Sequence, residues 1–380
     1  MVDKKIIYSS IINSHIKIWE QLKNISISER VGSAYLFFGP SGVGKELVAI
    51  KFAQLLNCEQ SQEEICGACS SCIRFSSLQH ENLNLIFPLP ALKEKSGTDG
   101  IDIDKNNIDI VSQTIQLKSK DPFLKIKISK ANRILLQSIR RLRKTLYLRS
   151  QSSGRRMVLV FDSHLLNVGQ GESANAFLKI LEEPPSNTTI ILVTDYTKLL
   201  PPTILSRCQK IGFSRLSNIF IKQWCEDKSV NESHIPILIG LSRGNVHRVN
   251  SLIARPLEEL IKSISTSVQT ITNENPVHWK KFVNTYSQIS KQNENEFYFH
   301  FYILRIWFQS AYRLSRNIDH VLHSTSFLDG MKTFNRSYPK ADFNAIINEI
   351  EKPSLAKSKN YFMPLVLLNL LLETQRYLKS

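Results

Sequence analysis

The chain has 380 residues, of which 42% are hydrophobic and 22% charged, an ordinary composition for a globular protein. This length excludes a single hydrophobic core, because single cores stop growing near ~250–300 residues, and we expect two or three domains. A formal net charge of +16 favours an anionic partner such as nucleic acid, a nucleotide or an acidic protein, without choosing among them.

Neither end of the sequence predicts membrane insertion or export. Residues 1–10 carry Lys4 and Lys5 but no apolar segment of a signal peptide. The longest apolar run near the C-terminus, residues 363–372, is broken by Asn369 and is shorter than the ~20 residues of a membrane span. We expect a buried helix there and a cytoplasmic protein without membrane contact.

Short apolar runs alternate with helical patterns over the first two-thirds of the chain, which predicts a parallel sheet with helices on both faces. A helix is expected at residues 45–56 and another at 174–183, where two prolines stop it. A polar stretch predicts an inserted loop at about 91–130. The expected strands are residues 35–38, 83–87, 157–161 and 189–194.

Strand patterns fade after Phe213, and helical patterns follow to the end of the chain. Residues 214–255 read as short helices, and residues 256–380 as longer helices rich in aromatic side chains. The sequence therefore predicts an α/β domain at 1–213, a small helical lid at 214–255 and an all-helical domain at 256–380.

A glycine-rich segment with the pattern of a P-loop follows the first strand and opens a helix. Glycines let backbone N–H groups curl around phosphate oxygens, and the helix N-terminus adds a positive dipole. The alternative is a chance glycine-rich turn. A working P-loop continues with Ser or Thr, which ligates Mg²⁺, whereas Glu46 stands here and should weaken binding of ATP or ADP. The candidate nucleotide-binding residues are Gly39, Gly42, Gly44 and Lys45.

The strand at 157–161 is followed by Asp162, which fits the metal-binding aspartate of a Walker B segment, or else a strand-end cap. Active ATPases place a glutamate next, but Ser163 stands here and an alcohol is not a base at neutral pH. His164 should point to the other face of the strand and is not expected to replace the base.

Arg207 follows the last predicted strand and places a permanent charge at the edge of the sheet. In oligomeric ATPases an arginine there projects into the site of the next subunit. On spacing alone, a surface salt bridge is the favoured explanation of Arg207.

Four of the six cysteines form the pattern C-x7-C-x2-C-x2-C. Four thiolates suit tetrahedral Zn²⁺ in a closed, structural site. The alternatives are an iron–sulfur cluster, whose outlying cysteine usually lies downstream rather than upstream, and no metal. The candidate ligands, within a module at 58–72, are Cys58, Cys66, Cys69 and Cys72.

Four segments occur in one order: the P-loop, the four-cysteine insertion, residues 174–185 (ANAFLKILEEPP) and residues 202–208 (PTILSRC). In this order the chain resembles the clamp-loader subunits of the bacterial DNA polymerase III holoenzyme, gamma/tau and delta-prime. The resemblance covers about residues 33–213. It implies an AAA+ fold, an oligomerisation collar at 256–380, zinc at the four cysteines and Arg207 as a finger acting in trans.

The resemblance also implies that Thr194 is the first sensor residue and that His247 holds the position of the second sensor arginine. Glu46 and Ser163 depart from the pattern of the motor subunits and favour a delta-prime type. We therefore expect a subunit of the holoenzyme, a nucleotidyltransferase complex, without ATPase activity of its own.

The implied partners are the gamma/tau and delta subunits in a hetero-pentameric ring, the sliding clamp and primed DNA. Two other hypotheses stay open: an active gamma/tau-like ATPase, and an unrelated zinc protein that binds nucleic acid and keeps a vestigial P-loop. Basic residues in and after the insertion are candidates for DNA phosphate contacts, or else form a solvated basic face. They are Lys118, Lys120, Lys125, Lys127, Arg140, Arg141, Arg143 and Lys144.

Overall fold

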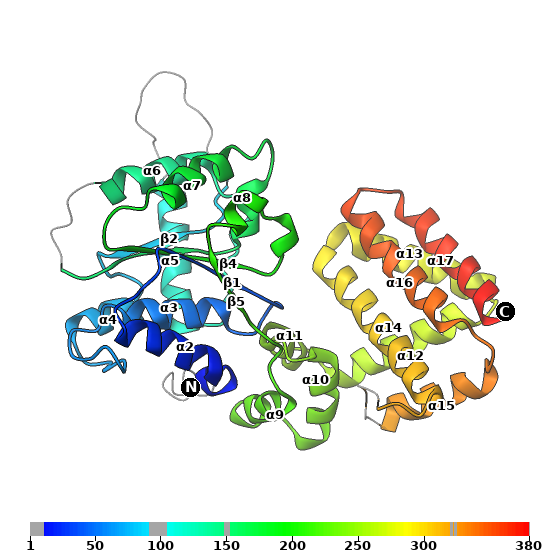
Figure 1. Cartoon of the computed structure of the whole chain (residues 1–380). Helices are drawn as coiled ribbons and strands as arrows, with labels where there is room; N and C mark the ends of the chain where they lie inside the picture. The colour runs from blue at the N-terminus through cyan, green and yellow to red at the C-terminus, as the bar shows by residue number, and fades with distance from the viewer. Residues whose placement is uncertain (1–10, 91–104, 148–152, 320–321, 323–324, 380) are drawn as a thin grey trace. The chain divides into compact units, whose positions relative to one another are not determined.

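A computed structural model describes residues 11–90, 105–147, 153–319, 322 and 325–379. The chain divides into two compact units (Figure 1). The first comprises Met1–Phe220 with Gly244–His247, and the second comprises Ile221–Arg243 with Arg248–Ser380.

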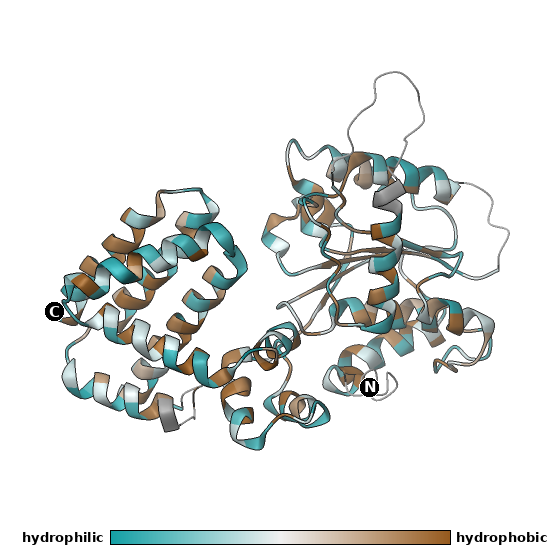
Figure 2. Ribbon diagram, turned by 180° about the vertical axis from the view of Figure 1, so that it is seen from behind, coloured by the Kyte–Doolittle hydropathy of each residue, from teal (hydrophilic) through white to brown (hydrophobic). Residues whose placement is uncertain are grey.

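The first unit contains a five-stranded sheet in the order β2-β3-β4-β1-β5, with parallel pairing between neighbours. Buried apolar residues dominate the central strands (Figure 2), as parallel sheets covered on both faces require. The four predicted strands are confirmed, whereas β5 was missed because its polar residues lie exposed at the edge of the sheet. The strands are β1 Ala34–Phe38, β2 Leu83–Ile86, β3 Arg156–Val160, β4 Thr188–Thr194 and β5 Gln209–Gly212.

Helices cover the two faces of this sheet (Figure 1). Side chains alternate along β1: Leu36 joins the core beneath α6 and α7, whereas Tyr35 packs against Phe52 of α3 with ring centroids 5.8 Å apart. The helices of this unit are α2 Ile16–Ile27, α3 Lys45–Leu55, α4 Ser70–Ser76, α5 Lys105–Lys120, α6 Leu136–Tyr147, α7 Glu172–Glu182 and α8 Pro202–Leu205, with short 3₁₀ turns η1 Ser163–Asn167 and η2 Thr197–Leu199.

The predicted inserted loop is corrected in part. Residues 91–104 lie outside the described residues, but residues 105–120 form helix α5. Val111 and Ile115 of α5 are half-buried and lie one helical turn apart, as in an amphipathic helix. The polar stretch before them hid this periodicity.

The second unit is helical, as the sequence predicts. Aromatic side chains of α14, α15 and α16 form its core, where Phe334 lies against Trp307, Phe308 and Phe343 with ring centroids 5.5 to 5.6 Å apart. Its helices are α9 Asn218–Asp227, which begins in the first unit, α10 Ile235–Ser242, α11 Val246–Ile253, α12 Leu257–Thr272, α13 Pro276–Gln292, α14 Glu294–Ser315, α15 Thr325–Ser337, α16 Phe343–Ser358 and α17 Met363–Leu378.

The apolar run near the C-terminus forms α17, which is only partly buried. Leu367, Leu370 and Leu371 are buried, but Leu365 is 65% exposed and Leu372 is 51% exposed. The expected helix is therefore present, and it is buried on one face only. Of the helices in the described part of the chain, none has both the length and the hydrophobicity that crossing a membrane requires.

Candidate functional site

The carboxyl ends of three adjacent strands bring the predicted nucleotide residues together. Strand β4 lies between β1 and β3, with Phe38 aligned to Thr194 and Val160 aligned to Leu192. The glycine-rich segment follows β1, and Asp162 follows β3. Asp195, which directly follows β4, therefore lies between them.

The glycine-rich segment has a backbone that only glycine adopts easily. Gly39, Gly42 and Gly44 have φ values of +145°, +70° and +91°. A Cβ on Gly39 would lie 2.3 Å from the carbonyl oxygen of Phe213, and one on Gly42 would lie 1.9 Å from Oδ1 of Asn245. Gly44 is the residue before α3. The segment thus has the strand, loop and helix of a P-loop.

Lys45 is turned back onto its own loop. Its Nζ donates to the carbonyl oxygen of Gly39 at 2.9 Å and to that of Pro40 at 2.5 Å, and it lies 2.7 Å from Oδ1 of Asp195. Burial lowers the pKa of Lys45, and the pairing with Asp195 opposes this effect. The ammonium therefore already has partners in the chain.

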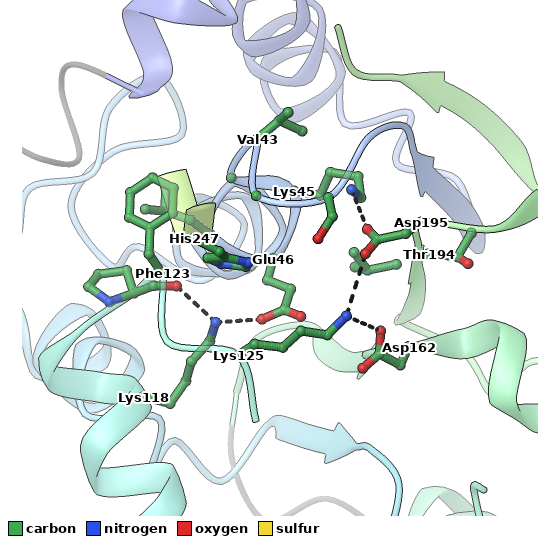
Figure 3. A pocket seen from close by; sticks show the side chains of 16 residues that line it. Val43, Lys45, Glu46, Lys118, Phe123, Lys125, Asp162, Thr194, Asp195 and His247 are labelled. Atoms are coloured by element: carbon green, nitrogen blue, oxygen red, sulfur yellow. Dashed lines mark hydrogen bonds and ion pairs between the residues drawn. The ribbon is translucent and has the colours of Figure 1, made fainter. Parts of the chain in front are cut away.

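Two lysines from the segment that begins in α5 enter the same pocket (Figure 3). Lys118 is 2% exposed, pairs with Glu46 and donates to the carbonyl oxygen of Pro122 at 2.8 Å. Lys125 Nζ lies 2.7 Å from Oδ1 of Asp162 and 3.4 Å from Oδ2 of Asp195. The hypothesis that Lys118 and Lys125 contact DNA is therefore wrong, because their ammonium groups face carboxylates inside the protein.

These contacts set the charges of the pocket. Burial alone would lower the pKa of Lys125, but Asp162 and Asp195 outweigh it, and the pKa lies above its usual value. Burial alone would raise the pKa of Asp195, but Lys125 and Lys45 outweigh it, and the pKa is lowered. Both groups are therefore charged at neutral pH.

The pocket leaves little free space. The cavity between the side chains measures about 30 Å³, which is room for a water molecule or two. In this arrangement Lys118, Lys125 and Glu46 occupy the space beside the P-loop.

Ser163, His164 and His247 have different surroundings. Ser163 is fully buried, its hydroxyl has no hydrogen-bond partner within the described residues, and it does not line the pocket. His164 Nδ1 lies 3.1 Å from Oγ1 of Thr194, and burial lowers the pKa of His164. His247 does line the pocket, and burial lowers its pKa too. A neutral imidazole thus holds the position expected for the second sensor.

Arg207 lies after α8 at the surface, where its side chain is 37% exposed. Its guanidinium pairs with Glu182 of α7 at 2.7 Å and donates to the carbonyl oxygen of Thr203 at 3.0 Å. The surface salt bridge considered from the sequence is therefore present. The pair also holds the guanidinium at the end of α7.

The four clustered cysteines of the first unit converge. Their Sγ atoms all lie within 4.8 Å of one another, and those of Cys66 and Cys72 are 3.8 Å apart. Four sulfurs around Zn²⁺ at ~2.3 Å would be about 3.8 Å apart. Backbone N–H groups of Cys69 and Cys72 donate to Sγ of Cys66 and Cys69, which favours thiolates. The residues fit a single metal ion. In an iron–sulfur cluster the four cysteines are divided among two or four irons, so the four sulfurs do not all lie this close together.

Sequence reasoning missed Asp195, Lys118 and Lys125 as residues of the pocket. Asp195 could have been predicted from the sequence, because it follows a predicted buried strand at the carboxyl edge of the sheet. The partners of Lys118 and Lys125 lie about 40 to 70 residues away in the sequence, and no local pattern marks such pairs.

The sheet order, the P-loop after β1 and the aspartate after β3 define an AAA+ type nucleotide-binding fold, here followed by a helical C-terminal region. The family model described as "DNA polymerase III, delta subunit" matches residues 14–217. The chain belongs to this family. Its membership excludes the hypothesis of an unrelated zinc protein.

Individual relatives agree with this assignment. The chain is 25% identical over 284 residues to DNA polymerase III subunit delta' of Bacillus subtilis, covering 74% of this chain and 67% of that protein. It is 26% identical over 243 residues to subunit tau of the same organism, covering 62% of this chain and 35% of that protein. The chain thus spans about a third of the length of the tau relative.

A solved structure, a DNA polymerase III gamma subunit-related protein of Thermotoga maritima, aligns with a TM-score of 0.41 at 16% identity. The alignment covers 94% of this chain and 99% of that one.

Proposed function

We propose that this chain is a non-catalytic, delta-prime type subunit of the DNA polymerase III clamp loader, which donates Arg207 to the ATP site of a neighbouring subunit. The observation that carries the proposal is the state of its own pocket. Glu46 takes the place of the hydroxyl that would ligate Mg²⁺, and the chain's own lysines fill the pocket. Ser163 offers no base and does not line the pocket.

Arg207 supports the second half of the proposal. Its guanidinium is partly exposed, follows α8 at the edge of the unit and is paired only at the surface. An arginine that reaches a neighbour's phosphates stabilises the charge that develops on their oxygens as the γ-phosphoryl leaves. The ion pair with Glu182 engages Nη2 and orients the guanidinium while the side chain stays partly exposed.

Zinc fits the proposal as a structural cofactor. Cys58, Cys66, Cys69 and Cys72 would hold it in a closed site with no open coordination position, so it supplies folding energy rather than chemistry.

Family membership supports the proposed partners. We expect gamma/tau and delta subunits in a hetero-pentameric ring, with the sliding clamp and primed DNA as its substrates and the cytoplasm as its location. We assign residues 1–213 to the AAA+ domain, 214–255 to the lid and 256–380 to a collar that holds the ring together. Exposed leucines of α17 support the collar assignment, because they form an apolar stripe suited to another helix.

A second candidate function is an active gamma/tau-like ATPase. The retention of Lys45, Asp162 and Thr194 at the pocket favours it. For ATP to bind in that case, the pocket would have to open, and Lys118 and Lys125 would have to break their ion pairs with Glu46, Asp162 and Asp195.

The experiment that separates the two compares Arg207→Ala with Lys45→Ala in a loader reconstituted from purified subunits. Arg207→Ala should lower hydrolysis at the neighbouring site by roughly 10³-fold or more, since a finger contributes ~10³–10⁵. Lys45→Ala should leave hydrolysis nearly unchanged. Equal losses would identify this chain as a motor, and an unaffected Arg207→Ala would refute the trans role.

A further inference from the structure

Six charged side chains of the first unit form a closed set around the P-loop, which we name the lysine–carboxylate cluster. Three ammonium groups face three carboxylates, so the formal charge of the cluster is zero. Its members are Lys45, Lys118, Lys125, Glu46, Asp162 and Asp195.

Lys125 lies where a P-loop ATPase needs its metal. The ammonium bridges Asp162, in the Walker B position, and Asp195 at the end of the neighbouring strand, at 2.7 and 3.4 Å. Two carboxylates that converge on one point repel each other unless a cation lies between them. Here the cation belongs to the chain.

Lys118 pairs in a similar way with a carboxylate next to the P-loop. It neutralises Glu46, the residue in the position of the Mg²⁺-ligating hydroxyl, and its second partner is the carbonyl oxygen of Pro122. The side chain is almost completely buried. Figure 3 shows Lys118 and Lys125 pointing into the pocket from one side, with Glu46 between them and the loop.

We infer that Lys118 and Lys125 are a built-in replacement for the metal and the nucleotide: they hold the phosphate loop and the strand ends together and exclude Mg²⁺–ATP. The loss of the Mg²⁺ ligand at Glu46 is then not what keeps nucleotide out. This inference goes beyond the proposed function, since it concerns the folded chain by itself and holds whether or not Arg207 acts in trans.

The first test measures thermal unfolding of the full-length chain. Lys125→Met removes the bridging cation and leaves two facing carboxylates, so the Tm should fall by roughly 5–15 °C. Mg²⁺ alone should restore part of this loss by binding between Asp162 and Asp195. The wild-type Tm should respond neither to Mg²⁺ nor to Mg²⁺–ATP. Lys127→Met, which changes an exposed lysine of the same segment, is the matched control and should leave the Tm unchanged.

The second test asks which residues exclude the nucleotide, and it uses binding of fluorescent ATP with Mg²⁺. Glu46→Ser alone should bind no better than wild type. Glu46→Ser combined with Lys118→Ala and Lys125→Ala should gain at least about tenfold in affinity, because the pocket then lacks both lysine side chains and carries the usual metal ligand.

Three results would overturn the inference. They are a wild-type Tm raised by Mg²⁺–ATP, a Lys125→Met variant with wild-type Tm or no response to Mg²⁺, and a Glu46→Ser variant that binds ATP as well as the triple variant does. If Lys125→Met does not fold, the charge-balanced double variant Lys118→Met with Glu46→Gln replaces it. A Tm of this double variant that does not respond to Mg²⁺–ATP, as in the wild type, would contradict the inference that the lysines exclude the nucleotide. All measurements use the isolated chain, so a result that contradicts this inference does not test the proposed role of Arg207 at a neighbouring subunit.

Discussion

At the residue scale, Glu182 and Arg207 form an ion pair that joins the end of α7 to the segment after α8. We predict that Glu182→Gln lowers ATP hydrolysis by the reconstituted loader by a few-fold, less than Arg207→Ala does. The amide still accepts a hydrogen bond, but it holds the guanidinium less firmly than a carboxylate does.

The readout that separates positioning from stability is the Tm of the isolated chain. It should stay within about 2 °C of wild type, because exposed ion pairs contribute little to folding. A normal hydrolysis rate in Glu182→Gln would show that Glu182 does not position Arg207.

The residues of the pocket show which features a sequence can predict. Lys45, Asp162 and Thr194 line one pocket. The glycine-rich segment before Lys45 follows β1, Asp162 lies just after β3 and Thr194 ends β4, and the hydrophobic runs of these strands are visible in the sequence. Lys118 was misread as a surface residue. A lysine side chain gives no local sign of burial, and its partner Glu46 is contributed by another element of the fold.

At the element scale, the segment from Cys58 to α4 depends on its four sulfurs. We predict one zinc ion per chain, measured by elemental analysis. Cys69→Ser should lose this zinc and destabilise the segment through the loss of the metal, because serine still caps α4 but is a poor zinc ligand.

Cys225→Ser is the matched control. Cys225 is buried in the second unit, and burial raises the pKa of its thiol to about 11. The Cys225→Ser variant should bind as much zinc as the wild type. Iron with a visible absorption band, or no metal at all in the wild type, would contradict the zinc assignment.

The elements that sequence reasoning missed share one physical cause. Strand β5 is held by its pairing with β1 rather than by its own composition, since three of its four residues are exposed. Helix α5 begins inside a polar stretch. Lys118 ties its C-terminal end to Glu46 beside the P-loop, and Lys125 ties the chain beyond it to Asp162 after β3. Contacts with distant residues decided both structures, whereas the central strands and α3 follow from local hydrophobic patterns.

At the scale of the whole molecule, several buried histidines predict a pH-dependent stability. Burial lowers the pKa of His15, His164, His247 and His300 from the usual value of 6.5. The unfolded chain therefore binds protons that the folded chain rejects. Their contribution is fully present above pH 6.5 and is lost as the pH falls towards the lowered values.

We expect the Tm to fall by several degrees between about pH 7.5 and about pH 5.5, followed by circular dichroism. His247→Gln should show a smaller fall than wild type, because glutamine does not titrate. An equal or larger fall in this variant would assign the pH dependence to other groups.

Ring assembly is the last property that the whole chain must support, and the exposed face of α17 is the feature of the second unit that bears on it. Leu365, Leu368 and Leu372 are 65%, 40% and 51% exposed and recur at helical spacing, so they form one stripe. An exposed apolar stripe on a helix gains stability when another helix covers it, at ~25 cal/mol per Å² of apolar surface. In the proposed collar that helix belongs to a neighbouring clamp-loader subunit.

We predict that Leu365→Lys combined with Leu368→Lys leaves the Tm of the isolated chain nearly unchanged but abolishes co-elution with gamma/tau and delta in size-exclusion chromatography. Val277→Lys, at a side chain that is 74% exposed on α13, is the control and should assemble normally. Normal assembly of the double variant would mean that the stripe on α17 is not part of the collar interface, whereas a large loss of Tm would mean that these leucines stabilise the isolated fold.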